Sequence, residues 1–597
     1  MNWKNLRNTS MNNALATLAI IGVILSAISS ARAGTYDGPA ELPRVYIQSS
    51  LANTPAPGKT LTVAAGGSIQ AALNQASCGD TIRLQAGATF TGVYIFPAKK
   101  CDNAHWIIVR TSAPDTSLPP EGTRIKPCYA GVSSLPARPA FNCTSTANVM
   151  VKLVMGTNFG SGPIVFAPGA NHYRLIGIEV TRRPGAYIIY NLAFVSIGGS
   201  ASYLVFDRVW MHGTTNDDTS RGVLLSGLSN VAIVDSFFTD FHCTALTGAC
   251  SDAQAILGGI GNIPSSTYKI VDNFLEASTE NIMFGGGNSP SAPADIEIRR
   301  NHFFKPLSWM KGQPNFVAGN SGNPFTVKNF FELKNAQRVL FEGNILENTW
   351  GGFSQTGFAM LLTPKNQMIN GINICPLCEV TDITVRYSTI SHVAGGFQIA
   401  NGVAGNAGAL AGERYSIHDV VVDDIDGAKY KGPSLFAQIS SAAGAPLLNN
   451  VSIGHVTAFA PNTIFMVGNP ASAPKIPNLI VTNSIFNASP YPVWSTGGTS
   501  NCAAPDVPLT TFKACFSPYL FTGNTMFAPT KNFPSTSWPS GNYFPSSAAA
   551  VGFVNYNNGN GGNYQLTTAS PYKARATDGK NIGADIVTIN QLTAKVY

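Results

Sequence analysis

Short segments of alternating apolar and polar residues recur along this 597-residue chain and predict an all-β solenoid, a β-helix. From about residue 164 these segments lie about 28 to 44 residues apart, the irregular spacing of a repeat protein that carries loop insertions. Glycine (58) and proline (38) are abundant, and charged residues make up only 12%. This turn-rich composition fits an all-β fold better than a helical one.

The repeated unit is a strand that ends in Asn, Ser or a charged residue and continues into a second apolar pair. It occurs in YRLIGIEV (173–180), YLVFDRVW (203–210), VAIVDSFF (231–238), YKIVDNFL (268–275), IEIRRNHFF (296–304), VLFEGNIL (339–346), ITVRYSTI (383–390), YSIHDVVV (415–422), VSIGHVTAF (451–459) and LIVTNSIF (479–486). A second short strand precedes most units. A β-propeller is the alternative, but it would show steadier spacing of about 40 to 45 residues and four strands per blade.

The stretch VKNFFELKNAQRVLFEGNILENTW (327–350) shows the alternation most clearly, as two strands joined by a polar turn. The residues expected to face the core are Phe331, Leu333, Val339 and Phe341. The residues expected to face outward are Lys328, Glu332 and Lys334. We therefore interpret this stretch as one coil of the stack, with a charged outer face.

The N-terminus has the pattern of an export signal, and residues 1–33 are predicted to be a signal peptide. Lys4 and Arg7 precede an apolar core, and Ala31-Arg32-Ala33 is a small-x-small cleavage site. A retained membrane anchor is the alternative, but the apolar core is short for a span of about 20 residues. The mature protein is then expected to be secreted, to the periplasm or beyond the cell, with no membrane association.

After the signal we expect a leader (34–60) and a single β-helix domain (61–597). Within the domain we expect an N-terminal cap (about 61–163), the main coils (about 164–490), and C-terminal coils with a cap (about 491–597). The segment SIQAALNQA (68–76) predicts a short amphipathic capping helix with Ser68 as its N-cap. Such a cap covers the apolar end and the unpaired backbone of the first coil.

All ten cysteines lie beyond the predicted cleavage site and fall into local pairs: Cys78 with Cys101, Cys128 with Cys143, Cys243 with Cys250, Cys375 with Cys378, and Cys502 with Cys515. In an exported chain this pattern predicts disulfides. The CPLC motif at Cys375 could instead be redox-active or half of a zinc site. It has no second CxxC motif and no βαβ context, so a structural disulfide is favoured.

The net charge of +7 is weak and unclustered, which argues against a nucleic-acid partner. Charged and amide side chains instead gather on a few neighbouring predicted coils. Aligning RGVLLSG (221–227), AQAILGG (253–259), ENIMFGG (280–286) and NFFELKN (329–335) places Arg221, Glu280 and Asn329 in one column. The neighbouring columns then hold Asp252 and Lys328 on one side, and Gln254 and Asn281 on the other, with Glu332, Lys334 and Gln355 further along the face. We expect this stripe to bind a polysaccharide, in a monomeric protein.

Several segments resemble exported right-handed parallel β-helix proteins of the pectate-lyase-like superfamily. These are the capping helix followed by GDTIRL, the ending SPYKARATDGKNIGAD, and the central segments NIMFGGG, DIEIRRNHFFKPLSW, VKNFFELKNAQRVLFEGN and QTGFAMLLTPKNQ. The resemblance covers about residues 60 to 590 and extends to a largely uncharacterised bacterial group. No residue of a known lyase site can be matched to this chain.

The resemblance implies β-elimination from a uronic-acid polysaccharide. This reaction needs a base for the C5 proton and a cation beside the substrate carboxylate. We expect Lys334 or Lys328 as the base, and Arg221, Arg299 or Arg338 as the neutralising group. Gln254, Glu280, Asn281, Glu332, Arg338, Trp309, Trp350 and Gln355 are expected to bind substrate. Asp252, Glu280 and Glu332 could hold Ca²⁺ as a cofactor.

Two other functions remain open from the sequence. A glycoside hydrolase would need two carboxylates, and Asp217 and Asp218 with Asp252 or Glu280 are candidates. A non-catalytic carbohydrate-binding protein could use aromatic rings near the stripe, namely Phe284, Phe303, Trp309, Trp350 and Phe353. His212, His242 and His302 show no metal-ligand spacing and are interpreted as polar or packing residues. Polar outer faces and Asn or Ser stacks inside turns are also structural features of β-helices.

Overall fold

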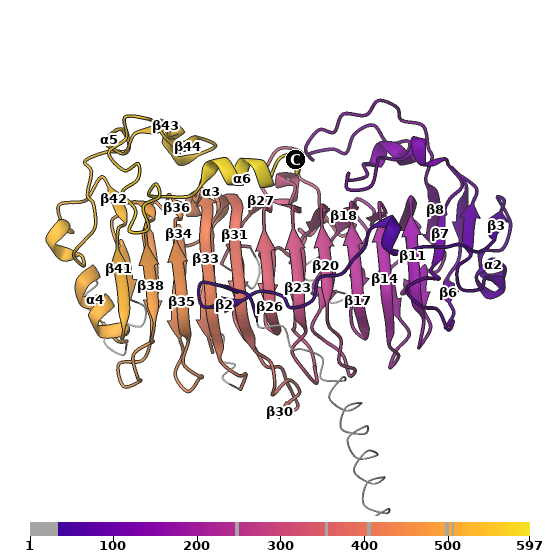
Figure 1. Cartoon of the computed structure of the whole chain (residues 1–597), viewed down its shortest axis with the longest axis horizontal. Helices are drawn as coiled ribbons and strands as arrows, with labels where there is room; N and C mark the ends of the chain where they lie inside the picture. Colours follow the sequence, from indigo (N-terminus) through magenta and orange to yellow (C-terminus); the bar gives the residue numbers. More distant parts are fainter. Residues whose placement is uncertain (1–33, 245–249, 353–355, 403–407, 496–500, 504–506) are drawn as a thin grey trace, which may run out of the picture. The chain divides into compact units, whose positions relative to one another are not determined.

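The computed structural model describes residues 34–244, 250–352, 356–402, 408–495, 501–503 and 507–597. The predicted signal peptide (1–33) lies outside the described residues. Tyr36–Tyr597 form one compact unit. This unit is a right-handed parallel β-helix, as predicted, and its strands stack coil upon coil (Figure 1).

The shorter of the two long sheets receives one strand from each successive coil, and these strands pair in parallel. Its strands are β6 (Tyr94–Phe96), β9 (Phe159–Gly160), β10 (Ile164–Phe166), β13 (Ile188–Val195), β16 (Thr219–Leu224), β19 (Gln254–Gly258), β22 (Ile282–Phe284), β25 (Phe331–Leu333), β28 (Phe358–Leu362), β32 (Gly395–Asn401), β34 (Leu435–Ser441), β37 (Thr463–Gly468) and β40 (Val493–Ser495).

The larger sheet contains two rows of parallel strands, so most coils contribute two strands to it. The first row is β3 (Thr60–Val63), β4 (Thr81–Leu84), β7 (Ile107–Thr111), β11 (Asn171–Ile176), β14 (Ala201–Asp207), β17 (Leu228–Val234), β20 (Tyr268–Val271), β23 (Ala294–Arg299), β26 (Ala336–Glu342), β31 (Val380–Val393), β33 (Gly412–Val422), β35 (Asn449–Gly454), β38 (Leu479–Thr482) and β41 (Tyr519–Thr522). The second row is β5 (Thr89–Thr91), β8 (Val151–Met155), β12 (Ile178–Arg182), β15 (Trp210–His212), β18 (Phe237–Phe241), β21 (Phe274–Ala277), β24 (His302–Phe304), β27 (Ile345–Thr349), β36 (Thr457–Ala458), β39 (Ile485–Asn487) and β42 (Thr525–Phe527), with β31 and β33 long enough to extend into it.

The corner between these two rows explains the repeated sequence unit. The first corner residue has a positive φ, as in Asp272 (57°) and Arg300 (56°), which turns the chain from one row to the next. In the central coils the second corner residue is an inward asparagine or serine, as at Ser236, Asn273, Asn301, Asn344 and Ser388. Some corners elsewhere carry an aliphatic residue instead, as at Ile178, Val209, Val420 and Val456. Asn273 N donates to Asn301 Oδ1 (3.0 Å), and Asn301 N donates to Asn344 Oδ1 (2.8 Å). These stacked amides satisfy buried backbone groups at the corner, so they are structural.

The predicted inward residues of the stretch 327–350 are confirmed. Phe331, Leu333, Val339 and Phe341 are fully buried in the continuous interior core. Phe330 also points into this core, directly beside Phe331. Two successive inward residues interrupt the simple alternation at this corner of the coil.

Short helices and hairpins lie at the ends and the rim of the solenoid (Figure 1). The N-terminal capping helix α2 (Ile69–Gln75) is confirmed, and Ser68 accepts a hydrogen bond from Ala71 N as the predicted N-cap. The other α-helices of the described residues are α3 (Gly427–Tyr430), α4 (Pro508–Cys515), α5 (Ala548–Val551) and α6 (Ile586–Leu592), and the hairpins outside the coils are β29–β30 (Met368–Ile369, Ile372–Asn373) and β43–β44 (Phe553–Asn555, Asn563–Leu566). A third hairpin, β1–β2 (Tyr36–Asp37, Ala40–Glu41), lies against the larger sheet beside β31 and β33.

All five predicted cysteine pairs form disulfides, including Cys375 with Cys378 in the CPLC motif. Cys375 and Cys378 are both fully buried, which agrees with the structural role that we favoured. Among the described residues, no helix has the length and apolar character needed to cross a membrane.

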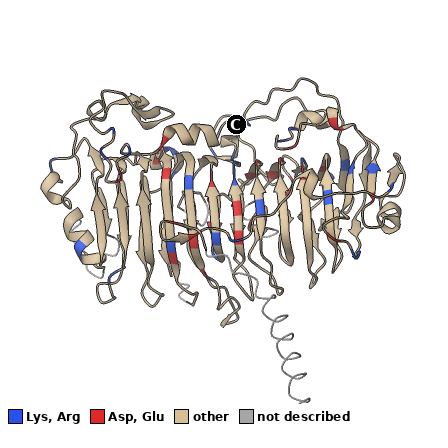
Figure 2. Cartoon of the chain, in the orientation of Figure 1, with Lys and Arg blue, Asp and Glu red and all other residues tan. Residues whose placement is uncertain are grey.

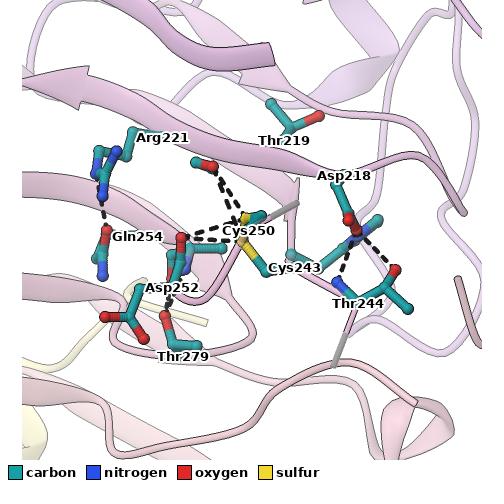
Figure 3. Close-up of a disulfide and its surroundings, with 12 residues drawn as sticks. Asp218, Thr219, Arg221, Cys243, Thr244, Cys250, Asp252, Gln254 and Thr279 are labelled. Carbon is teal, nitrogen blue, oxygen red and sulfur yellow. Dashed lines mark hydrogen bonds and ion pairs between the residues drawn. A yellow bond between two sulfur atoms is a disulfide. The ribbon is translucent and has the colours of Figure 1, made fainter. Parts of the chain in front are cut away.

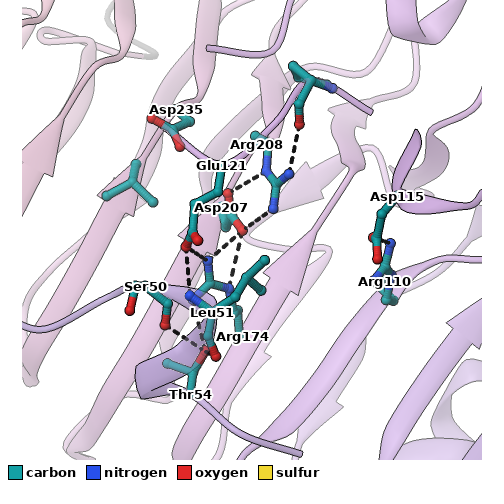
Figure 4. A network of polar contacts seen from close by, with 12 residues as sticks. Ser50, Leu51, Thr54, Arg110, Asp115, Glu121, Arg174, Asp207, Arg208 and Asp235 are labelled. Carbon is teal, nitrogen blue, oxygen red and sulfur yellow. Dashed lines mark hydrogen bonds and ion pairs between the residues drawn. The ribbon is translucent and has the colours of Figure 1, made fainter. Parts of the chain in front are cut away.

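The leader crosses the outer face of the larger sheet as an extended strap, which we define as residues 36–54 (Figure 1). At one end Asp37 contacts Arg386 and His418, on β31 and β33. At the other end Arg174 on β11 donates to Ser49 O (2.6 Å) and to Thr54 Oγ1 (2.9 Å). Figure 4 shows Arg174 at the centre of this second anchor, and Figure 2 shows acidic and basic residues interleaved along the face that the strap crosses.

Candidate functional site

The predicted stripe lies on the outer face of the shorter sheet, over β16, β19, β22 and β25. The register pairs Arg221 with Gln254, and the same offset carries the column through Glu280 to Asn329. The shared column of Arg221, Glu280 and Asn329 is as predicted, whereas Gln254 lies within this column and not in the next one. The sequence alignment was thus one residue out at β19. The column has one residue on each of four neighbouring coils, whose strands lie about 4.8 Å apart.

Two buried glutamates form the centre of this cluster. Glu280 and Glu332 are 0% and 2% exposed, and their carboxyl groups are close enough to hydrogen-bond to each other. Glu280 Oε2 accepts from Gln254 Nε2 (2.8 Å). Within the described residues, Glu280 Oε1 and Glu332 Oε2 have no hydrogen-bond partner. Protonation of one carboxyl group would give the pair a donor for such a bond.

Two lysines hold this glutamate pair. Lys328 Nζ lies 2.6 Å from Asp252 Oδ1 and 3.5 Å from Glu280 Oε1, so it bridges a partly exposed and a buried carboxylate. Lys334 Nζ lies 3.1 Å from Glu332 Oε1. The predicted outward set is therefore on the outer side of the sheet but nearly inaccessible, since Lys328 and Lys334 are each 8% exposed.

Burial and the neighbouring charges give Glu280 and Glu332 different pKa values. Burial opposes the ionisation of Glu280, but Lys328 and Lys334 hold its pKa at about 2. Burial raises the pKa of Glu332 to about 7. The negative charge of Glu280 also raises this pKa, whereas the positive charge of Lys334 lowers it. Below about pH 7 the pair therefore holds one proton and one negative charge, and above it both carboxyl groups are ionised.

The same ion pairs correct the roles predicted for the lysines. Although burial disfavours their charged forms, the surrounding carboxylates raise the pKa of Lys328 and of Lys334 above the usual lysine value. Both side chains are therefore protonated at neutral pH. In this state they can neutralise a substrate carboxylate, and the same positive charge opposes the role of base that we predicted for them.

Arg221 and Asp252 are the more accessible members of the cluster. Arg221 Nε donates to Gln254 Oε1 (3.0 Å), and burial lowers the pKa of Arg221. The Cys243–Cys250 disulfide lies beside these residues and joins the end of β18 to the segment that carries Asp252 (Figure 3). This disulfide fixes the start of β19 close to Arg221.

Arg299 and Arg338 do not belong to this site. Both lie on the larger sheet, on β23 and β26, and not on the face that carries Arg221. Arg299 contacts Glu297 (3.1 Å) and Glu342 (2.8 Å), and Arg338 Nε contacts Asp295 Oδ1 (2.8 Å). These two arginines therefore lie on another face of the coil and are not part of the cluster around Arg221.

The predicted aromatic contacts are also corrected. Trp309 and Trp350 are 1% and 4% exposed and pack with Phe325 and Tyr430 in a side cluster, so both rings are already covered by protein side chains. Phe284 and Phe303 belong to the interior core, and Phe353 and Gln355 lie outside the described residues.

Asn281 faces the interior and not the stripe, because it occupies the inward column of Phe330. Its side chain donates to the carbonyl oxygens of Leu275 and Phe304 and accepts from Lys305 Nζ (2.8 Å). Lys305 is a fully buried lysine that our sequence reasoning missed, and burial lowers its pKa to about 7. A lysine directly after the apolar run HFF was the available signal.

The predicted calcium ligands do not form a metal site. Across the described ranges, no three His, Cys, Asp or Glu side chains are grouped so that they could hold a metal ion. Asp252, Glu280 and Glu332 face lysine ammonium groups instead.

The aspartates proposed for a hydrolase have structural partners. Asp217 accepts from Thr214 Oγ1 (2.7 Å) and Asn320 Nδ2 (2.6 Å), and Asp218 accepts from the backbone and side chain of Thr244. Both aspartates are less than 9% exposed. They fix loops beside β16 and are not positioned as a catalytic pair. The neighbouring His242 stacks on Phe325, with ring centroids 3.8 Å apart, which agrees with a packing role.

No protein family model matches this chain, and no curated protein matches it by sequence. Among solved structures, it is similar to an alginate lyase from Paenibacillus sp. str. FPU-7 (13% identity, 73% of this chain and 95% of that chain, TM-score 0.29). It is also similar to pectate lyase Pel9A (11%, 89% and 97%, 0.34) and to a family 28 exopolygalacturonase from Yersinia enterocolitica (12%, 76% and 74%, 0.32). At these TM-scores the matches carry no argument about the reaction, and the fold assignment rests on the parallel register described above.

Proposed function

We propose that this chain is an exported carbohydrate-active enzyme that cleaves a uronic-acid polysaccharide by β-elimination on the outer face of the shorter sheet. The observation that supports this proposal is the convergence of three basic side chains, Arg221, Lys328 and Lys334, around the buried carboxyl groups of Glu280 and Glu332. The disulfides are consistent with export, because they form in oxidising compartments.

The basic side chains suit the substrate carboxylate. Abstraction of the C5 proton leaves negative charge that delocalises onto this carboxylate, and nearby cations stabilise the charge as it develops. Lys328 lies between the partly exposed Asp252 and the buried Glu280, so an incoming carboxylate can replace Asp252 as the partner of Lys328. Arg221 can bind the same group through its two-pronged guanidinium.

The glutamate pair suits the two proton transfers. Glu280, the ionised member, would take the C5 proton, the C4–O bond would break as the C4–C5 double bond forms, and protonated Glu332 would donate to the departing oxygen. A pKa of about 2 makes Glu280 a weak base in the free protein. A substrate carboxylate that pairs with Lys328 would weaken the ion pair between Lys328 and Glu280, and the pKa of Glu280 would then rise.

Hydrolysis is the second candidate reaction, and the split pKa values of Glu280 and Glu332 are the observation that favours it. The proximity of the two groups argues against it. Glycosidases place their carboxyl groups about 5 to 10 Å apart, on either side of the bond that is cleaved. A hydrogen-bonded pair leaves no room for the sugar between its members.

The test is incubation with polygalacturonate, alginate, a glycosaminoglycan and a neutral glucan, each with and without a chelator. A lyase releases an unsaturated product that absorbs in the ultraviolet. New reducing ends without this absorbance would establish a hydrolase. Retention of a glycan without cleavage would establish a binding protein.

A matched pair of arginine variants tests the location of the site. Arg221→Ala should lower the rate at least about 100-fold, because it removes a cation from the reacting carboxylate. Arg299→Ala, on the larger sheet, should leave the rate within about twofold of the wild type. The reverse result would show that the active site is not on the shorter sheet.

A further inference from the structure

We infer that a second ligand site lies on the larger sheet and takes one or two residues of a carboxylated sugar. The site is a pocket of about 520 Å³, within the usual range for small-ligand sites of about 300 to 1,000 Å³. It does not include any residue of the candidate active site, so it stands independently of the proposed reaction.

Three separate parts of the chain build this pocket. The floor comes from β18, β21 and β24 through Phe237, Phe274 and His302, and the walls come from residues 122–141 and from the segment after α6. Phe237 and Phe274 stack with ring centroids 4.3 Å apart, and Phe274 meets the His302 ring edge-on at 5.2 Å. This apolar floor can support the C–H face of a sugar ring.

The charged side chains of the walls are mostly basic. They are Arg124, Lys126, Arg300 and Lys595, against one acidic side chain, Asp272. Arg124 neutralises Asp272 (3.1 Å), and Arg300 donates to the carbonyl oxygens of Leu592 and Ala594.

The two lysines are left with unbalanced charge. Within the described part of the chain, neither Lys126 nor Lys595 forms an ion pair, and Lys595 is exposed at the rim. The unbalanced charge of the pocket is therefore positive, which favours an anionic ligand.

His302 indicates that the ligand also carries a hydrogen-bond donor. It is fully buried, and its Nε2 lies 2.8 Å from Glu347 Oε2. Its Nδ1 atom has no hydrogen-bond partner among the described residues. Burial lowers the pKa of His302, so the ring is neutral, with its proton on Nε2 toward Glu347 and Nδ1 left as an acceptor.

An unsatisfied buried acceptor is costly, and a ligand hydroxyl can supply the missing donor. A simple aromatic carboxylate would match the positive charge and the phenylalanine floor, but it has no hydroxyl to donate. A carboxylated sugar supplies a ring, a carboxylate and hydroxyl donors together. The three features of the pocket therefore point to this class of ligand.

The test is calorimetric titration with D-galacturonate, with D-galactose and benzoate as probes that lack the carboxylate and the hydroxyls, respectively. Binding should require both groups, so galacturonate should bind at least about tenfold more tightly than either probe. The double variant Lys126→Ala/Lys595→Ala should lose this binding by about tenfold or more. The control Lys475→Ala/Lys573→Ala, at exposed lysines elsewhere, should not.

Galacturonate could also bind at the candidate active site, so the titration is repeated with Arg221→Ala. If this variant retains binding and the Lys126→Ala/Lys595→Ala double variant loses it, the second site is established, whatever the outcome for the proposed reaction. Loss of all binding in Arg221→Ala, or binding that is unchanged in the lysine double variant, would overturn the inference. His302→Phe keeps the ring and removes the acceptor, and it should weaken binding of galacturonate but not of benzoate.

Discussion

The attachment of the strap should depend on pH through His418. This histidine contacts Asp37 of the strap through Nε2 (3.0 Å) and Asp419 through Nδ1 (2.8 Å). Burial disfavours the charged form, but the hydrogen bonds to the two aspartates raise the pKa of His418 from 6.5 to about 9. The protonated ring therefore stabilises the attached strap.

The size of this contribution follows from the pKa. A difference of one pKa unit corresponds to about 1.4 kcal/mol, so a rise from 6.5 to about 9 corresponds to about 3 kcal/mol of folding free energy, divided between Asp37 on the strap and Asp419 on β33. Because the folded-state pKa is the higher one, this stabilisation is complete below pH 6.5 and is lost as the pH rises through about 9. Arg386 still holds Asp37 at high pH, so the strap is weakened and not fully released.

Hydrogen exchange of residues 36–54 and urea unfolding, at pH 6 and pH 10, measure this effect. The wild type should lose about 3 kcal/mol more than His418→Gln over this interval. His105→Gln is the matched control, because His105 contacts Asp102 at an exposed position and should change little. An identical pH dependence in the wild type and in His418→Gln would refute the reasoning.

Three further predictions concern the site, the corner and the pocket. Glu332→Gln should lower the cleavage rate at least about 100-fold and abolish the loss of activity expected as the pH rises through about 7, which a pH–rate profile would show. Asn301→Ala should lower the free energy of unfolding by about 3 to 5 kcal/mol in urea, since it leaves buried groups such as Asn273 N without a partner. A decrease below about 1 kcal/mol would contradict the structural role of the corner amides. Cys128→Ala/Cys143→Ala opens a loop of 15 residues and should cost about 3 kcal/mol in the same assay. It should also weaken galacturonate binding, because the loop carries part of the pocket wall.

The sequence predicted the features that depend on local pattern. The inward positions of Phe331 and Phe341 follow from alternation, and the disulfides follow from the short spacing of each cysteine pair. Alternation fails where two successive residues point inward, as at Asn281 and Ile282. For this reason Asn281 was assigned to the wrong face.

The electrostatics of the site depend on contacts that the sequence does not contain. Lys328 belongs to the coil of β25, but its charge is set by Asp252 and Glu280 from two other coils. A strand pattern places a lysine on a face, but it does not reveal whether a neighbouring coil brings a carboxylate within 3 Å. Likewise, Trp309 is buried in a cluster that includes Tyr430, a residue far from it in the sequence.

The strap also bears on the order in which the chain can fold. Its first anchor joins Asp37 to His418, 381 residues later in the sequence. The coils can assemble progressively from neighbour to neighbour, and Ser49 and Thr54 can contact Arg174 as soon as β11 has formed. Asp37, in contrast, has its partners only once β31 and β33 exist. Seating of residues 36–41 would thus report that most of the solenoid is complete, and until then this end of the strap would remain accessible to proteases.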